Sequence, residues 1–500
     1  MNAVNESVIR EVVQEVLGRL GKLPAAPSPA AAAPRPAAAP VSGAPSTPVP
    51  ARAGTTRRFG VFPDANEACE AAGAAFLQLR EKGVAARAKV EEIIKTLADR
   101  NATEWGRIEL EETKIGRLDH KIEKLKIIKL VPGVDWLRPD ARSGDHGITL
   151  EEYTPFGVIG AVTPSTHSIP TLSGNVVNIV AAGNAVVFNA HPAACRCAAM
   201  AVRVYNEAIH REIGIENLIT IIEQPTIESF KAMCGNEHVR LLCVTGGPGV
   251  VKAAMQTGKR AICAGPGNPP VLVDATADLE RAARSVIQGG AYDNNLLCIG
   301  EKEIFVLEQV ADKFMAALER AGAVRLNSGQ LERLTKEAFT FAPGHGAGCP
   351  EPVVNKQLVG KDAAVLARIA GASVPEKTEL LFAETDASHV FVLEEQMMPF
   401  VPVVRVSSVQ EGILAAKTAE HNYRHTAIIH SHDVSNMTAM GRALDTTLFV
   451  KNGPCMAGLG LGGEGYLSYS IATPTGEGVT NPRTFTRVRR CVMVDNLRIY

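Results

Sequence analysis

The sequence predicts an α/β protein built around parallel, doubly wound sheets, and two observations carry that prediction. Short apolar runs alternate with helical patterns from residue 156 to 264, and a second alternating segment runs from Pro269 to about residue 478. Such strand–helix alternation is typical of parallel sheets, whose ligands bind at the carboxyl ends of the strands. The chain of 500 residues is long enough for two or three domains with large cores.

In the first alternating segment, the apolar runs are expected to be strands and the stretches between them helices. The expected strands are 157–162, 185–188, 218–222 and 241–244. The expected helices are 170–182, 192–211, 226–234 and 248–257, preceded by two more near 64–82 and 84–100.

In the second segment, a strand is expected at 269–274, and Asp278 begins a helix that ends near Gly289-Gly290. The run 294–298, which ends in Cys298, follows this helix and leads into a strand at 303–307. The C-terminal residues 485–500 alternate in the manner of an edge strand or a dimer arm.

The N-terminal region predicts a helix on a flexible tether. Residues 2–20 place valine, isoleucine and leucine on one helical face and charged residues on the other. Residues 24–54 are almost entirely Ala, Pro, Ser and Gly, a composition that cannot form a core and that spans roughly 90 Å when extended. Because the tether is so long, we favour a partner surface over the protein's own body as the binding site of the apolar face.

The composition argues against several classes of function. The net charge is -1 and aromatic residues make up 5%, which gives no basis for binding nucleic acid or acidic membranes. No apolar run approaches the roughly 18 residues of a transmembrane helix. Ten irregularly spaced cysteines indicate a reducing, cytoplasmic compartment. We predict no metal site, because Cys195 and Cys197 are too close together and the histidines 421, 425, 430 and 432 are expected to diverge.

Two segments are candidates for chemistry. The turn 246–249, Gly-Gly-Pro-Gly, follows an expected strand and opens a helix, where backbone N–H groups can bind a phosphate. A tight turn made only for packing is an equally good interpretation, because the dinucleotide fingerprint is absent. Cys298 lies between a helix end and a strand, where its thiolate can attack an aldehyde and become a thioester after hydride loss. For any one of ten cysteines, an inert buried thiol is the more common role.

The body of the chain, from about 57 to 500, resembles the aldehyde dehydrogenase superfamily. Within it, the chain resembles the CoA-acylating enzymes of bacterial microcompartments, which act on propionaldehyde or acetaldehyde in propanediol or ethanolamine use. The matching segments are TPFGVIGAVTPST at 154–166, AAGNAVVFNAHP at 181–192, VTGGPGVV at 244–251, AGPGNPPVLVD at 264–274, NNLLC at 294–298, MPFVPVVRV at 398–406 and RRCVMVDNLRIY at 489–500.

The resemblance implies a domain organisation. It implies a Rossmann-type cofactor domain at 57–138 and 156–263, an α/β catalytic domain at 264–478, and a β oligomerisation arm at 139–155 and 479–500 that pairs subunits into a homodimer or homotetramer. The N-terminal residues resemble an encapsulation peptide, with an amphipathic helix at 1–20 and a disordered linker at 21–56. The implied partner is a shell or cargo protein, and the implied location is the lumen of a microcompartment.

The resemblance also implies roles for individual residues. Cys298 corresponds to the catalytic thiol, and Thr166 or the backbone near Cys298 corresponds to the oxyanion donor. His167 stands where related enzymes commonly have an asparagine. Glu395 matches the glutamate that holds the nicotinamide ribose. The implied cofactor-binding residues are Thr163, Pro164, Ser165, His191, Pro192, Thr245, Gly246, Gly247, Val250, Gly265, Glu395 and Pro399.

Two departures from the hydrolytic members of the superfamily are informative. Cys263 stands in place of the general-base glutamate that activates water, so a thiol such as that of coenzyme A can compete for the thioester. Asn189 and Pro192 stand in place of the lysine and glutamate that bind the adenosine ribose. This fits a cleft that NAD and CoA occupy in turn, and the lack of a nearby arginine for a 2′-phosphate favours NAD over NADP.

The function implied by the resemblance is oxidation of a short aldehyde, propionaldehyde first and acetaldehyde second. NAD+ and CoA are consumed, and acyl-CoA and NADH are formed by a ping-pong route through a Cys298 thioester. Leu296, Leu297 and Ile299 suggest an apolar substrate pocket. Two alternatives stay open: a hydrolytic aldehyde dehydrogenase that makes the free acid, and a non-catalytic scaffold of a microcompartment.

Overall fold

The computed structural model describes residues 58–342 and 351–496. The helix expected at 1–20 and the linker expected at 21–56 lie outside these residues. Among the helices that the model does describe, none combines the length and the hydropathy that crossing a bilayer requires.

The first sheet confirms the predicted parallel, doubly wound architecture. Its six strands have the order β1-β6-β5-β4-β7-β8, and every neighbouring pair is parallel. The strands are β1 (Val61–Phe62), β4 (Val158–Thr163), β5 (Ala185–Ala190), β6 (Ile219–Ile222), β7 (Val239–Thr245) and β8 (Ala261–Ala264). The four strands expected in this segment correspond to β4 to β7, whereas the short edge strands β1 and β8 had no predictable pattern.

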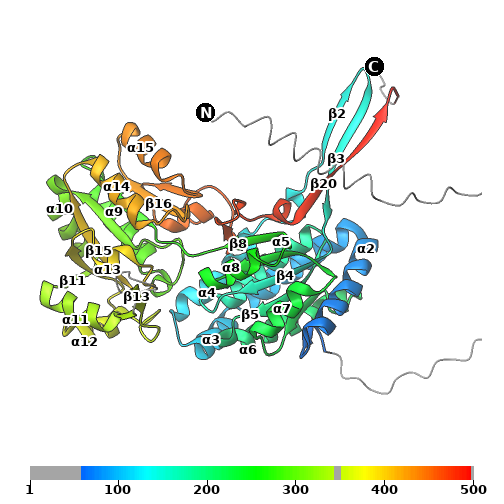
Figure 1. The fold of residues 1–500 in the computed structure, drawn as a ribbon, viewed down its shortest axis with the longest axis horizontal. Helices are drawn as coiled ribbons and strands as arrows, with labels where there is room; N and C mark the ends of the chain where they lie inside the picture. Colours follow the sequence, from blue (N-terminus) through cyan, green and yellow to red (C-terminus); the bar gives the residue numbers. More distant parts are fainter. Residues whose placement is uncertain (1–57, 343–350, 497–500) are drawn as a thin grey trace, which may run out of the picture. The chain divides into compact units, whose positions relative to one another are not determined.

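Helices cover this sheet (Figure 1). They are α2 (Ala65–Arg100), α3 (Ala102–Thr113), α4 (Leu118–Lys126), α5 (Ser168–Ala181), α6 (Cys195–Ile213), α7 (Ile227–Gly235) and α8 (Pro248–Met255). The two helices expected before and after residue 83 form the single element α2. It is kinked at Gly83, where φ is 73° and ψ is -163°, a conformation that glycine adopts without steric cost.

The second sheet has seven strands in the order β11-β14-β15-β10-β9-β16-β17, again with parallel neighbours. The strands are β9 (Pro270–Val273), β10 (Glu303–Leu307), β11 (Val324–Arg325), β14 (Leu381–Thr385), β15 (Phe400–Val406), β16 (Thr426–His430) and β17 (Leu448–Lys451). Its helices are α9 (Leu279–Gly290), α10 (Glu308–Arg320), α11 (Ser328–Ala338), α12 (Ala363–Ala370), α13 (Val390–Leu393), α14 (Val409–Ala419) and α15 (Val434–Leu444).

The expected strand at 303–307 is β10, and the expected helix after Asp278 is α9. The side chain of Asp278 accepts a hydrogen bond from the backbone N–H of Arg281 at 3.0 Å, which caps the first turn. The helix ends at Gly290, as its glycine pair predicts.

A separate three-stranded antiparallel sheet joins β2 (Asp140–Gly144), β3 (Gly147–Pro155) and β20 (Thr486–Val494). These strands lie side by side in Figure 1. Strand β20 exposes the apolar side chains of Val488, Val492 and Val494. The smaller elements are β12 (Phe339–Ala342), β13 (Glu351–Val354), β18 (Ile471–Ala472), β19 (Gly478–Val479) and the 3-10 helices η1 (Ile127–Leu130), η2 (Val134–Trp136), η3 (Pro192–Ala194), η4 (Tyr292–Asn295), η5 (Cys455–Leu459) and η6 (Pro482–Phe485).

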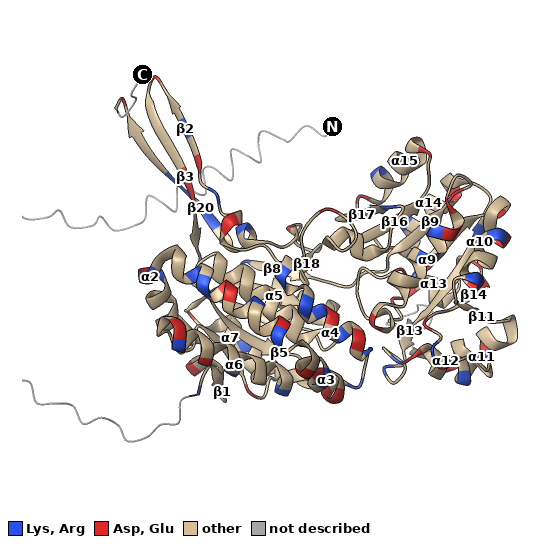
Figure 2. Ribbon diagram, turned by 180° about the vertical axis from the view of Figure 1, so that it is seen from behind, with Lys and Arg blue, Asp and Glu red and all other residues tan. Residues whose placement is uncertain are grey.

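Burial on both faces explains why the strands of both sheets have nearly continuous apolar sequences. Strands β4 and β5 are buried at every position, because helices lie on both faces of a doubly wound sheet. The ribbon in Figure 2 shows basic residues, in blue, and acidic residues, in red, interspersed along the helices. The apolar strands therefore form the buried core of each sheet. Polar side chains that could bind a ligand lie in the loops at the carboxyl ends of the strands.

Candidate active site

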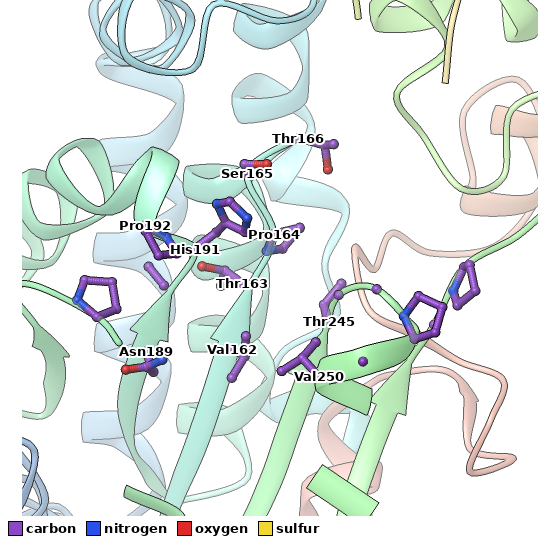
Figure 3. Close-up of a pocket in the computed structure, with 18 of the residues that line it drawn as sticks. Val162, Thr163, Pro164, Ser165, Thr166, Asn189, His191, Pro192, Thr245 and Val250 are labelled. Carbon is purple, nitrogen blue, oxygen red and sulfur yellow. The ribbon is translucent and has the colours of Figure 1, made fainter. Parts of the chain in front are cut away.

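A pocket of about 780 Å³ lies at the carboxyl ends of β4, β5 and β7. This is the edge at which parallel sheets bind ligands. Figure 3 shows Thr163 to Thr166 continuing from β4, with His191 and Pro192 at the end of β5. The predicted site residues that line the pocket are Thr163, Pro164, Ser165, Thr166, His191, Pro192, Thr245, Gly246, Gly247, Val250, Gly265, Cys298 and Glu395.

Pro399 is the predicted site residue that the structure does not bring to this pocket. It directly precedes β15, and its carbonyl accepts a hydrogen bond from the backbone N–H of Leu381 at 3.0 Å. Its backbone therefore belongs to the hydrogen-bonding ladder of the second sheet. Glu395, four positions earlier in the chain, precedes this strand and reaches the pocket.

The turn between β7 and α8 leaves its backbone accessible. Gly247 is the N-cap of α8, and Pro248 occupies the first helical position, where its missing N–H costs no hydrogen bond. A Cβ atom added to Gly247 or Gly249 would meet no atom within 4 Å. The helix N-terminus therefore borders open space on the pocket side, which suits a phosphate group of a nucleotide.

Cys298 follows a short left-handed turn that the sequence did not predict. Asp293, Asn294 and Asn295 have φ values of 49°, 57° and 63°. Aspartate and asparagine tolerate this region better than most residues with side chains. The Nδ2 of Asn294 donates to Gly360 O at 3.0 Å, and that of Asn295 donates to Glu301 O at 2.9 Å. The consecutive Asp-Asn-Asn was the only signal in the sequence for this turn.

Lys302 holds the loop that carries Cys298 from the other side. Its side chain is fully buried, and its Nζ donates to Asn295 O at 2.7 Å and to Leu297 O at 3.2 Å. It also donates to the side-chain oxygen of Asn295. Sequence reasoning missed this residue, because a lysine just before a strand gives no sign of being buried. Because the carbonyls of Asn295 and Leu297 lie within three residues of Cys298, these bonds from Lys302 fix the backbone next to the candidate nucleophile.

The surroundings of Cys298 keep its thiol protonated in the free protein. Burial raises the pKa of the Cys298 thiol to about 12, and the carboxylate of Glu395 acts in the same direction. Lys302 opposes this shift. The thiol therefore becomes a nucleophile when its proton is removed or when bound groups change this electrostatic balance.

Glu395→Gln should make Cys298 more reactive toward alkylation in the free protein. Removing a neighbouring negative charge lowers the pKa of the thiol and raises the thiolate fraction at a given pH. A shift of one pKa unit is about tenfold in that fraction, so a rise of about three- to tenfold is expected at about pH 8. The measurement is the rate at which iodoacetamide labels the peptide that contains Cys298. Glu394→Gln is the matched control, and equal rates for both variants would contradict this account.

The loop after β4 presents two possible oxyanion donors. The Thr166 hydroxyl lies 2.7 Å from Nδ1 of His167, and both residues line the pocket. Burial, together with Lys124 and Lys121, lowers the pKa of His167 well below its ordinary value, so the imidazole is neutral. A neutral imidazole forms one hydrogen bond with Thr166 through Nδ1, and its Nε2 can bond to a different group. His167 thus joins Thr166 as a candidate, in the position where the resemblance implies an asparagine.

Within the described lining of the pocket, position 263 contributes no carboxylate that could activate water. Among the described residues that line it, Glu395 is the only carboxylate. Cys263 lies on β8 outside the lining, and burial raises the pKa of its thiol to about 11. The position that holds a general base in hydrolytic enzymes is therefore a buried, neutral thiol here.

At the end of β5, Asn189 offers a hydrogen-bond donor to the pocket. Its Oδ1 accepts the hydroxyl proton of Ser229 at 2.6 Å, which leaves the amide Nδ2 for another partner. Asn189 and Pro192 both line the pocket (Figure 3). The structure therefore places neutral groups where the resemblance implies that the hydrolytic enzymes carry charged ones.

Gly267 packs closely against the nucleophile loop. A Cβ atom at this position would clash with Cys298 O and lie 2.9 Å from Cγ of His425. His425 is buried, and burial lowers its pKa to about 4, so its imidazole is neutral. No group in the described parts of the chain bonds to its Nε2. The shared packing against Gly267 places His425 close to Cys298, a proximity that the sequence did not indicate.

The four clustered histidines do not converge. His425 directly precedes the buried strand β16 and His430 ends it, whereas Nε2 of His421 lies 2.5 Å from the carbonyl of Leu393. Within residues 58–342 and 351–496, no group of three or more His, Cys, Asp or Glu side chains is arranged to hold a metal ion.

Comparison with known proteins identifies the family and several similar enzymes. The model of the aldehyde dehydrogenase family matches residues 59–464. The acetylating acetaldehyde dehydrogenase of Salmonella typhimurium is 44% identical over 449 residues, which cover 89% of this chain and 95% of that protein. A crystal structure of the Rhodopseudomonas palustris propionaldehyde dehydrogenase, with bound CoA and an acylated cysteine, is 42% identical with a TM-score of 0.84 and covers 88% of this chain and 100% of that chain.

A third similar protein comes from a bacterial microcompartment. It is the propionaldehyde dehydrogenase of the Clostridium phytofermentans fucose utilisation microcompartment. It is 41% identical, its structure superposes with a TM-score of 0.84, and the match covers 88% of this chain and 100% of that chain.

Proposed function

Because this chain belongs to the aldehyde dehydrogenase family, we propose that it oxidises a short-chain aldehyde with NAD+ and CoA to acyl-CoA and NADH. The observation that carries this proposal is the position of Cys298. It lies in a pocket that also contains Glu395, Thr166 and the glycine turn before α8. Propionaldehyde is the favoured substrate and acetaldehyde the next. A non-catalytic scaffold would have no need for a cysteine and a carboxylate in one nucleotide-sized pocket.

The residues of this chain divide the chemistry among them. Cys298 Sγ attacks the carbonyl carbon of the aldehyde, and the Thr166–His167 loop stabilises the oxyanion that develops. NAD+, when bound, accepts the hydride that leaves the former aldehyde carbon. The acyl group then remains on Cys298 as a thioester, while Lys302 keeps the loop in place. Attack by the CoA thiol releases acyl-CoA and returns the Cys298 thiol.

The nucleotide would be held by the residues at the strand ends. The N–H groups of Gly247 and of Gly249, in the first turn of α8, suit a phosphate, and Glu395 is assigned to the hydroxyls of the nicotinamide ribose. Asn189 provides a neutral donor near the adenosine end. A neutral site does not repel the phosphate on the CoA ribose, which supports use of one pocket by NAD+ and CoA in turn. We favour NAD+ over NADP+.

CoA should be required for product formation at full rate. Position 263 supplies no carboxylate to activate water, so hydrolysis of the thioester is slow, whereas a thiol is an intrinsically better nucleophile. The measurement is NADH formation from propionaldehyde with and without CoA, with products identified by mass spectrometry. Acyl-CoA is expected with CoA, and about one NADH per active site without it. Multiple turnovers to the free acid at the full rate would instead identify a hydrolytic enzyme.

We further propose that residues 1–20 direct the enzyme into the lumen of a microcompartment, where a shell or cargo protein binds them. The support is the apolar helical face on a long tether, together with the microcompartment origin of a similar enzyme. A fluorescent protein fused to residues 1–54 should form puncta in compartment-forming cells. Diffuse fluorescence would contradict the proposal.

The arm residues 139–155 and 479–500 are proposed to join subunits into a dimer or tetramer.

A further inference from the structure

Four buried charged side chains lie next to the two loops that carry the proposed chemistry. They are Glu109 on α3, Lys121 and Lys124 on α4, and Asp293 on η4, and each is at most 1% exposed. We call them the buried charge quartet. We propose that the quartet is a positioning device that fixes the Thr166–His167 loop and the Asp293–Cys298 loop relative to each other. This inference rests on the proposed function of Cys298.

Asp293 is the member of the quartet that holds the nucleophile loop. Its Oδ2 accepts a hydrogen bond from Lys124 Nζ at 2.5 Å, and its Oδ1 accepts the backbone N–H of Arg117 at 2.7 Å. Its own backbone N–H donates to Nδ1 of His120 at 2.9 Å. Asp293 is also the first of the three left-handed residues before Cys298. Its side chain and its backbone are thus both fixed at the point where the chain turns toward the nucleophile.

Lys121 connects this carboxylate to the opposite loop. Its Nζ lies 3.9 Å from Asp293 Oδ2 and donates to the carbonyl of Thr166 at 3.3 Å. It also pairs with Glu109 at 3.0 Å, and the other oxygen of Glu109 accepts the N–H of Ile169 at 2.9 Å, at the start of α5. One ammonium group therefore lies next to both the backbone carbonyl of Thr166, the candidate oxyanion donor, and the carboxylate of Asp293, the first residue of the nucleophile turn.

Charged side chains in the quartet are better explained by a role in positioning the two loops than by a role in stabilising the core. Two cations and two anions cancel, but burying them carries a desolvation cost that apolar side chains of similar size would avoid. What apolar side chains would not provide is directional bonds to Thr166 O, Ile169 N and Arg117 N. Lys124 and Lys121 also lower the pKa of His167, and Lys124 opposes the rise in the pKa of Cys298. The same charges thus act on both reactive groups.

The test uses the full-length enzyme and the double variant Lys124→Met/Asp293→Asn. It removes one cation and one anion together, and the amide oxygen introduced at position 293 still provides an acceptor for Arg117 N. Stopped-flow measurement of the first NADH turnover without CoA reports acylation of Cys298. A loss of roughly 10- to 100-fold is expected, because small displacements of reacting groups have effects of that size. The dissociation constants of NAD+ and of CoA for the free enzyme should stay within about twofold, since the quartet does not line the pocket.

Two further variants separate positioning from folding. Lys126→Met changes an exposed lysine on the same helix and should acylate like the unmodified enzyme. Asp293→Glu keeps the charge but lengthens the side chain by one methylene. Its unfolding midpoint reports the cost of the added methylene, and at a temperature where it is folded it should still acylate more slowly, which keeps the test decisive if the double variant does not fold. Normal acylation by a folded quartet variant would overturn the positioning role. Absence of CoA-dependent turnover in the unmodified enzyme would instead overturn the proposed function.

Discussion

Replacing Cys298 by alanine should abolish aldehyde-dependent NADH formation while leaving the fold intact. The substitution removes the one sulfur that can form the thioester, and no other cysteine lines the described pocket. Loss of a nucleophile that forms a covalent intermediate lowers kcat by about 10⁴-fold or more. The measurement is the steady-state formation of propionyl-CoA, alongside thermal unfolding to show that the variant is folded.

Cys491→Ala provides the matched control for this experiment. Cys491 is an exposed cysteine on β20, and its replacement should leave acyl-CoA formation unchanged. If Cys298→Ala retained a substantial fraction of the activity, the assignment of the nucleophile would be wrong.

Gly267→Ala is expected to have the second-largest effect on activity. The new methyl group would clash with Cys298 O and lie 2.9 Å from the imidazole of His425, so the nucleophile loop has to move. Displacing a nucleophile by about 1 Å lowers the rate by roughly 100-fold. Overpacking of this kind also destabilises a fold by about 1–3 kcal/mol. We expect kcat to fall by about 100-fold and the midpoint of urea unfolding to decrease.

The control for this substitution is Gly329→Ala on α11, where a new Cβ would meet no atom closer than 3.6 Å. That variant should match the unmodified enzyme in kcat, and its urea midpoint should not decrease, because alanine is favoured over glycine inside a helix. If Gly267→Ala retained the normal kcat, the close packing between this glycine and the nucleophile loop would have no role in catalysis.

Much of the fold and of the pocket was predictable because its determinants are local in the sequence. The apolar runs of β4, β5 and β7 give the parallel sheet, and their ends bring Thr163, His191 and Gly246 to one edge. The glycine pair at 289–290 marks the end of α9. Periodicity and turn residues report such features directly.

What the sequence did not predict depends on contacts between distant residues. Lys124 and Asp293 are 169 positions apart, and Thr166 and Lys121 are 45 apart, so no local pattern could pair them. Nor does the charged side chain of Lys302 indicate that it is fully buried. Pro399 illustrates the opposite case: the motif that brings Glu395 to the pocket extends into a strand, and the backbone of Pro399 bonds to the sheet instead of lining the pocket.

The most direct test of the whole account is mass spectrometry of the enzyme incubated with propionaldehyde and NAD+ in the absence of CoA. We predict a propionyl group on the peptide that contains Cys298, present on most subunits and removed when CoA is added. A propionyl group on a different residue, or no adduct while NADH is still produced, would contradict the central claim that Cys298 carries the acyl group.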